Sequence, residues 1–131
     1  MARLEAAIYS ILSADLGLKA LVSTRIYPLL LPQNATLPAL TYARVSTERE
    51  SAFVSDPGLS TARIQVDVWG DTVSSVQNVA EEVRGALHRY KGTIAAVVVE
   101  ESHIENEVMM YEPETEIFHI VLDFSILHRE T

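Results

Sequence analysis

Four histidines and a group of glutamates are the residues whose chemistry could build a functional site. The histidines are His88, His103, His119 and His128. If the last two predicted strands pair around residue 112, His119 lies opposite Glu105, with His103 and Glu107 on the same face. Zinc uses imidazole and carboxylate ligands, so this arrangement is a candidate metal site. The spacing matches no known ligand motif, and a polar strand face with a His–Glu contact is the favoured interpretation.

Patterns that hydrolases and nucleotide-binding enzymes use are missing from the sequence. The chain has no cysteine, which excludes thiol nucleophiles, disulfides and thiolate zinc sites. No serine lies in a Gly-x-Ser-x-Gly turn, and the glycines are isolated, so no glycine-rich loop can hold a phosphate. Glu100 and Glu101 are adjacent in a predicted strand and therefore point to opposite faces. We expect a protein that is not an enzyme and has no cofactor.

The length of 131 residues fits a single domain covering residues 1–131, and the composition, 48% hydrophobic and 21% charged, is that of a globular protein. No apolar run approaches the roughly 20 residues that a membrane span needs, so no membrane partner is expected. The first residues do not resemble a signal peptide. These features predict a protein made in the cytosol or carried in particles assembled there.

Charge is distributed unevenly along the chain, whose formal net charge is −8. Residues 1–91 contain nine acids and nine Lys or Arg, whereas residues 92–131 contain nine acids and a single basic residue, Arg129. An acidic surface does not grip phosphates, so DNA binding is not expected, although DNA could slide past such a surface. A solvated acidic face that keeps the protein soluble is an equally good interpretation.

Apolar residues at helical spacing predict three helices. Two short helices cover residues 4–13 and 15–22. The main helix runs from an N-cap at Asp71 or Thr72 to about Tyr90. Its apolar stripe consists of Val76, Val79, Ala80, Val83, Leu87 and Tyr90.

Alternating apolar residues predict four strands, at residues 40–45, 62–69, 94–109 and 116–128. The last has the strongest period-two pattern, formed by Phe118, Ile120, Leu122, Phe124 and Ile126. Residues 48–60 are predicted to be a long loop between the first two strands. Trp69 points away from the apolar face of its strand, and we expect a second layer to bury it; a subunit interface is the alternative.

Hairpin connections between neighbouring strands favour an antiparallel sheet. The main helix must cover one face of that sheet to bury its stripe. The expected fold is therefore α+β: a mostly antiparallel four-stranded sheet packed by one long helix, with a short N-terminal helix pair.

Five segments follow one another along the chain in an order that suggests a family. They are the helix from Leu4 to Asp15, Arg-Ile-Tyr-Pro at 25–28, the strand start at 37–42, Ala-Arg-Ile-Gln-Val-Asp-Val-Trp at 62–69 leading into a helix, and Tyr-Glu-Pro-Glu-Thr at 111–115 before a strand with Asp123-Phe124. Together they resemble the tail terminator, or tail completion, proteins of long-tailed, siphovirus-like bacteriophages and prophages. The resemblance covers about residues 4–129 and consists of structural patterns, not catalytic motifs.

The resemblance implies a structural virion protein. Such subunits form rings, commonly hexamers, that cap the tail tube, stop its elongation and give the head connector or neck a joining surface. The implied partners are other copies of the chain, the tail tube protein and the head connector, while DNA only passes through the lumen. The implied location is the head-proximal end of the tail, after assembly in the host cytoplasm. The alternatives are a head-completion or neck protein and a small oligomeric ligand-binding or regulatory domain.

The hairpin of the last two strands is the first candidate contact site. In a regular strand, Val97 and Val99 share a face with the acidic residues that follow, so that face changes from apolar to acidic and the strand continues as an exposed arm. The arm is predicted to contribute to a ring interface or to the lumen wall; a solvated hairpin is the alternative. The residues concerned are Glu101, His103, Glu105, Glu107 and Tyr111.

The loop at residues 48–60 is the second candidate. Phe53 and Val54 are apolar in a polar segment, which suits a partner contact. With Arg49 and Glu50 they form a predicted contact site for the tail tube or another partner. In the alternative interpretation, the loop folds back and places Phe53 in the core.

Overall fold

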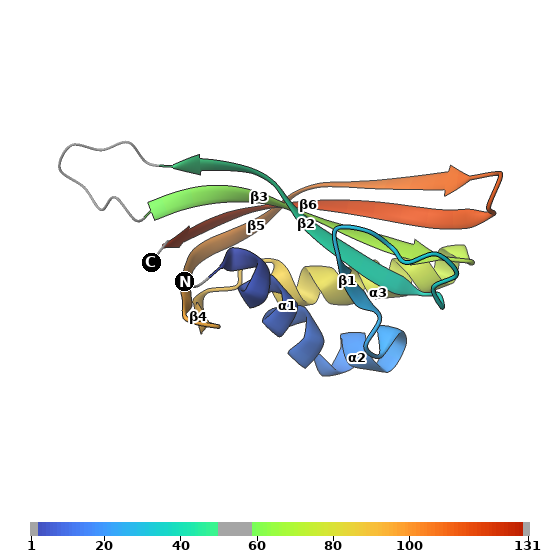
Figure 1. Cartoon of the computed structure of the whole chain (residues 1–131), viewed down its shortest axis with the longest axis horizontal. Helices are drawn as coiled ribbons and strands as arrows, with labels where there is room; N and C mark the ends of the chain where they lie inside the picture. The colour runs from blue at the N-terminus through green and yellow to red at the C-terminus, as the bar shows by residue number, and fades with distance from the viewer. Residues whose placement is uncertain (1–2, 50–58, 130–131) are drawn as a thin grey trace.

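The computed structural model describes residues 3–49 and 59–129, which form a curled sheet with helices on one side (Figure 1). The strands are β1 (Ile26–Pro28), β2 (Ala39–Arg49), β3 (Leu59–Gly70), β4 (Gly92–Ile94), β5 (Val97–Glu112) and β6 (Ile117–Arg129). The helices of this described part are α1 (Leu4–Ala14), α2 (Leu16–Val22) and α3 (Val73–Leu87).

The sheet, as far as it is described, has six strands in the order β1-β2-β3-β6-β5-β4. It is mixed, because β1 pairs parallel with β2 while the other neighbours pair antiparallel. The predicted α+β fold, with a four-stranded antiparallel sheet packed by one long helix, is therefore wrong. The molecule is mostly a curled, six-stranded sheet with short helices. The two missed strands, β1 and β4, have only three residues each, too few for periodicity to reveal.

One apolar core lies between the sheet and the helices. The central strands β3 and β6 each direct every second side chain toward it. These buried residues are Ile64, Val66, Val68, Ile120, Leu122, Phe124 and Ile126, and α3 adds Val76, Val79, Ala80, Val83 and Leu87. The predicted period-two face and most of the predicted helical stripe are confirmed. We call this side of the sheet the helix-covered face and the other side the helix-free face.

The junction between β3 and α3 is tight. A Cβ atom added to Gly70 would lie 2.6 Å from Cγ1 of Val76, so the closely approaching helix requires glycine there. The hydroxyl of Thr72 accepts a hydrogen bond of 3.1 Å from the amide of Ser75, which caps the helix as predicted. The helix ends at Leu87, one turn earlier than expected.

An ion pair joins α1 to β2. Arg44 Nη2 lies 2.7 Å from Glu5 Oε1. Burial alone raises the pKa of the Glu5 carboxyl, but the hydrogen bond and the positive charge of Arg44 outweigh burial, and the pKa lies below its ordinary value of 4.5. Because the folded-state pKa is lowered, the pair stabilises the protein above pH 4.5, and this stabilisation is lost as the pH falls through the folded-state pKa.

The substitution Glu5→Gln is therefore expected to reduce stability at neutral pH by no more than about 1 kcal/mol, since both side chains are partly exposed. The difference from the wild type should shrink as the pH falls below 4.5, where the carboxyl is protonated in the unfolded chain. Urea unfolding at several pH values measures this difference. Glu114→Gln, in the exposed turn after β5, is the control with no expected effect. A difference that does not change with pH would contradict the electrostatic explanation.

Candidate assembly surfaces

Strand β5 contains two β-bulges. They occur at Glu100 and Glu105, which are skipped in the register with β6 while the residues on either side are paired. Each bulge adds one residue to the strand and moves the following side chains to the opposite face of the sheet. A sequence pattern read with a strict period of two cannot follow these changes.

The prediction that the acidic residues of the hairpin share one face with Val97 and Val99 is therefore wrong. Glu101 and His103 lie on the helix-free face, whereas the buried Val99 lies on the helix-covered face. Glu105 occupies the second bulge, and Glu107 returns to the helix-covered face. The hairpin residues predicted to act together are thus divided between the two sides of the sheet.

Glu107 connects the outer part of β5 to α3. Its Oε1 lies 2.6 Å from Nη1 of Arg84. Both side chains are more than a third exposed, so the pair contributes at most about 1 kcal/mol to stability. This contact gives Glu107 a structural role within the subunit, which the sequence did not indicate.

The predicted contact between His119 and Glu105 is also wrong, because His119 pairs with Met110. Its Nε2 lies 2.8 Å from Oδ2 of Asp67, and its ring stacks on Trp69 with 3.8 Å between the ring centroids. In residues 3–49 and 59–129, no group of three or more His, Asp or Glu side chains is arranged to hold a metal ion.

Trp69 belongs to a hydrogen-bonded cluster on the helix-free face. Its Nε1 donates to Oγ1 of Thr41 at 3.0 Å, and Gln65 Nε2 donates to Oδ1 of Asp67 at 2.8 Å. With His119, these contacts join β2, β3 and β6. Trp69 is only half-buried, so the expectation of a second layer over it is wrong for the described part of the chain. Because its members bond to one another, the cluster stabilises the packing of these three strands.

The outer part of β5 is an exposed strand edge. Strand β4 pairs only with Val97–Val99, and no other described strand borders β5 on that side (Figure 1). Four consecutive apolar side chains near its end are 43–47% exposed: Val108, Met109, Met110 and Tyr111. Tyr111 also contacts Phe118, with ring centroids 4.7 Å apart. An unpaired apolar edge is typical of an association site, and a ring contact of this hairpin stays a prediction.

Within the run Val108–Tyr111, only Tyr111 was predicted to take part in a contact. In a strand with one apolar and one polar face, the glutamates are the residues that stand out, and an apolar run does not fit that pattern. Four apolar residues in succession place apolar side chains on both faces of a strand. That uninterrupted run was the available signal for an edge that contacts a partner.

The second predicted contact site is only partly described. Arg49 is exposed and forms the last residue of β2, not part of a loop, because both flanking strands are longer than expected. Glu50, Phe53 and Val54 lie outside the described residues. The role of these four residues in partner binding stays a prediction.

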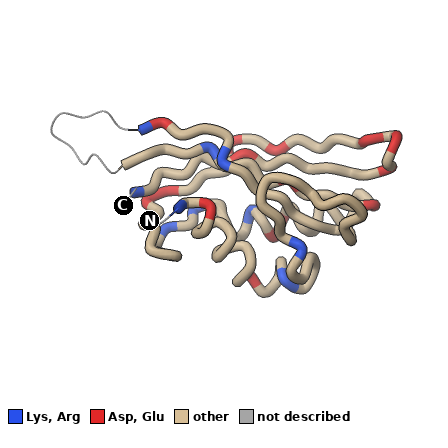
Figure 2. Tube along the Cα trace, in the orientation of Figure 1, with Lys and Arg blue, Asp and Glu red and all other residues tan. Residues whose placement is uncertain are grey.

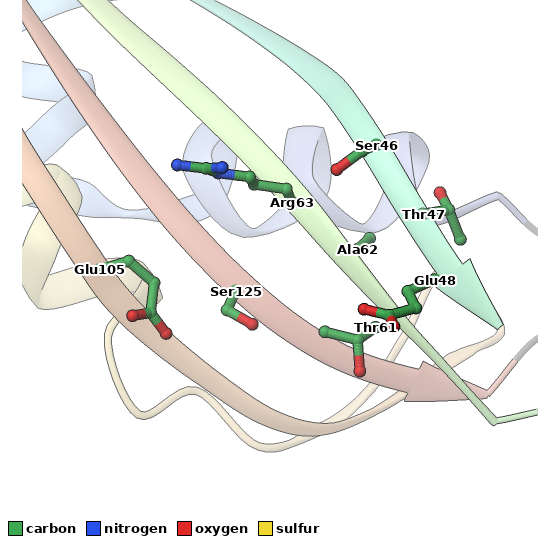
Figure 3. A pocket seen from close by; sticks show the side chains of 8 residues that line it. All are labelled: Ser46, Thr47, Glu48, Thr61, Ala62, Arg63, Glu105 and Ser125. Carbon is green, nitrogen blue, oxygen red and sulfur yellow. The ribbon is translucent and has the colours of Figure 1, made fainter. Parts of the chain in front are cut away.

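An open groove of about 640 Å³ lies on the helix-free face near the end of β2. Its lining residues are Ser46, Thr47, Glu48, Thr61, Ala62, Arg63, Glu105 and Ser125 (Figure 3). Arg63, Ser125 and Glu105 come from the adjacent strands β3, β6 and β5. Small-molecule sites are usually enclosed and largely apolar, so this open, polar lining fits a protein surface better than a small ligand.

Acidic residues occur along the β5–β6 hairpin and gather at its tip, whereas the basic residue of these two strands, Arg129, lies at their other end (Figure 2). The acidic excess of residues 92–131 therefore occupies a defined region. Strand edges and open polar surfaces suit contacts with other proteins, as in proteins that assemble into larger structures.

The model of a protein family described as tail completion protein gp17 matches residues 6–129. The chain belongs to this family. The resemblance to tail completion proteins is thereby confirmed, and the protein has a structural role in phage tails as a virion component. Family membership favours a protein without enzymatic activity.

A chain from a solved structure, titled "Virion of native gene transfer agent (GTA) particle", has a similar fold. The TM-score is 0.83 and the sequence identity 18%, over 98% of this chain and 95% of that chain. At this identity the likeness concerns the fold alone. No curated protein matches the sequence. In the described part of the chain, no helix combines the length and hydrophobicity needed to cross a membrane.

Proposed function

We propose that this protein is a tail terminator. Copies of the chain form a closed ring, commonly a hexamer, that caps the tail tube, stops its elongation and provides the surface to which the head connector or neck attaches. The protein then lies at the head-proximal end of the tail, after assembly in the host cytoplasm. The observation that carries the proposal is the match to the tail completion family over residues 6–129.

The exposed edge of β5 supports the proposed ring. Four half-exposed apolar side chains lie beside a strand edge that has no described neighbour, and an oligomer would bury them. If each subunit presents two different surfaces, the same contact repeats around the assembly, and it forms a ring when the rotation closes.

The charge distribution supports an unobstructed lumen. The acidic excess of residues 92–131 lies on the β5–β6 hairpin (Figure 2). A surface of this charge repels phosphates, so DNA passes it without specific binding. One ring face then contacts the last layer of the tube, and the other offers no surface to further tube subunits.

The proposal predicts a ring with about six subunits. Size-exclusion chromatography with light scattering, followed by electron microscopy, measures it for the concentrated protein, alone and mixed with the tail tube protein of the same particle. We expect end-on views with a central hole, and shorter tubes when the protein is present during tube assembly. A monomer that also ignores the tube protein would overturn the proposal. A ring that binds only the head connector would identify a neck protein instead.

A further inference from the structure

A second exposed edge lies on the other margin of the sheet. Strand β1 pairs with β2 only at Leu40–Tyr42, and no described strand borders β2 beyond Tyr42 on that side. Residues 45–48, here called the β2 edge, include the exposed Val45, Ser46 and Glu48. Residues 106–111 are called the β5 edge.

The two edges have directions that fit each other. Strand β2 is antiparallel to β3, β3 to β6, and β6 to β5, so β2 and β5 of one subunit run in opposite directions. When a second copy lies beside the first in the same orientation, its β2 edge meets the β5 edge of the first copy antiparallel. The alternation of the sheet then continues across the boundary between subunits.

We propose that the β5 edge of one subunit pairs antiparallel with the β2 edge of the next copy of the chain, so that one sheet runs around the ring. The inference rests on the proposed function, because it specifies the contact that forms the ring. Backbone hydrogen bonds join the edges, and Val108 and Met110 become covered on the helix-free face.

Charge favours this pairing over the pairing of two β5 edges. A contact between two β5 edges would bring Glu107 and Glu112 of both copies onto one strand pair. Like charges gathered across a strand pair are destabilising. The β2 edge contains a single acid, Glu48, and is followed by Arg49, so a β2–β5 contact gathers less like charge than a β5–β5 contact.

The offset of the two edges also fits a closed ring. Within one subunit, Ser46 pairs with Arg63, Arg63 with Ser125, and Ser125 with His103, so Ser46 and His103 lie in the same row across the sheet. Pairing the β2 edge with residues 106–111 therefore requires neighbouring subunits to be displaced along the strand direction. A sheet that closes on itself requires a stagger of this kind.

Disulfide cross-linking tests the pairing, and the absence of native cysteines removes background. Ser46 lies on the helix-free face, so its partner must be a β5 residue on that face: Asn106, Val108 or Met110. Ser46→Cys is combined with cysteine at each position in turn, under the conditions in which the ring forms. We expect one combination to give ladders of cross-linked subunits on a denaturing gel. Ser46→Cys with Leu16→Cys, on the exposed surface of α2, is the control without ladders.

A lysine substitution provides the second readout. Met110→Lys should abolish the ring and leave the circular dichroism spectrum unchanged, because Met110 is 43% exposed in the subunit. Leu16→Lys should retain the ring. A ring without cross-links in any combination would overturn the pairing but not the proposed function, as would cross-linked dimers of Val108→Cys alone. A protein without rings, with or without tube protein, would overturn both.

Discussion

Phe124→Ala is expected to lower the free energy of unfolding by about 3 to 5 kcal/mol, the usual cost of removing a buried aromatic ring. Phe124 is fully buried on the helix-covered face of β6. Its register places it between Ile64 of β3 and Ile104 of β5, and the helices lie over this face. Because the neighbouring strands are held by their hydrogen bonds, the cavity cannot fully collapse.

Chemical denaturation with fluorescence of the single Trp69 measures the Phe124→Ala effect. The matched control is Leu127→Ala in the same strand, because Leu127 lies on the helix-free face and is only half-buried. The control should cost clearly less. Equal losses for the two variants would contradict the assignment of the core to one face of the sheet.

Asp67→Ala is expected to cost about 1 to 3 kcal/mol, because it removes the hydrogen-bond partner of a buried imidazole. The side chain of His119 is 9% exposed and lies 2.8 Å from Asp67, which also accepts a hydrogen bond from Gln65. The variant keeps the stacking of His119 on Trp69 but leaves its Nε2 without its partner on the helix-free face.

The control for Asp67→Ala is Asp123→Ala on the same face. Asp123 lies 3.6 Å from Arg63, whose side chain is 54% exposed, so this pair is worth at most about 1 kcal/mol. Thermal unfolding of both variants measures the contrast. If Asp123→Ala proved as damaging as Asp67→Ala, the cluster around Trp69 would not be a distinct stabilising feature.

Long periodic elements were predictable from the sequence. The alternation from Ile120 to Ile126 identified β6, and helical spacing from Val76 to Leu87 identified α3. Each pattern exists because one face of the element must be buried, and these elements are long enough for the pattern to repeat several times. Strand boundaries were less accurate, since β2 continues to Arg49 through residues that read as polar loop.

The sheet as a whole was not predictable, because its margins depend on tertiary contacts. The parallel pairing of Ile26 with Leu40 depends on the position of the N-terminal helices and leaves no local pattern. The candidate site failed for a related reason. The bulges at Glu100 and Glu105 arise in the paired sheet, and they separate residues that a uniform strand would group.

The two bulges in β5 help to decide which of its side chains lie on each face of the sheet. The first bulge shifts the alternation of side chains by one residue, and the second bulge shifts it back. Val99 and Glu107 therefore face the same way, as they would in a strand without bulges, and only the residues between the two bulges change sides. Loss of Glu100 or Glu105, the residues that the register skips, would remove a bulge and leave Glu107 opposite Leu122 and within reach of Arg84. The bulges are thus the places where this hairpin can lose a single residue without turning its outer part over, a tolerance that a regular strand does not have.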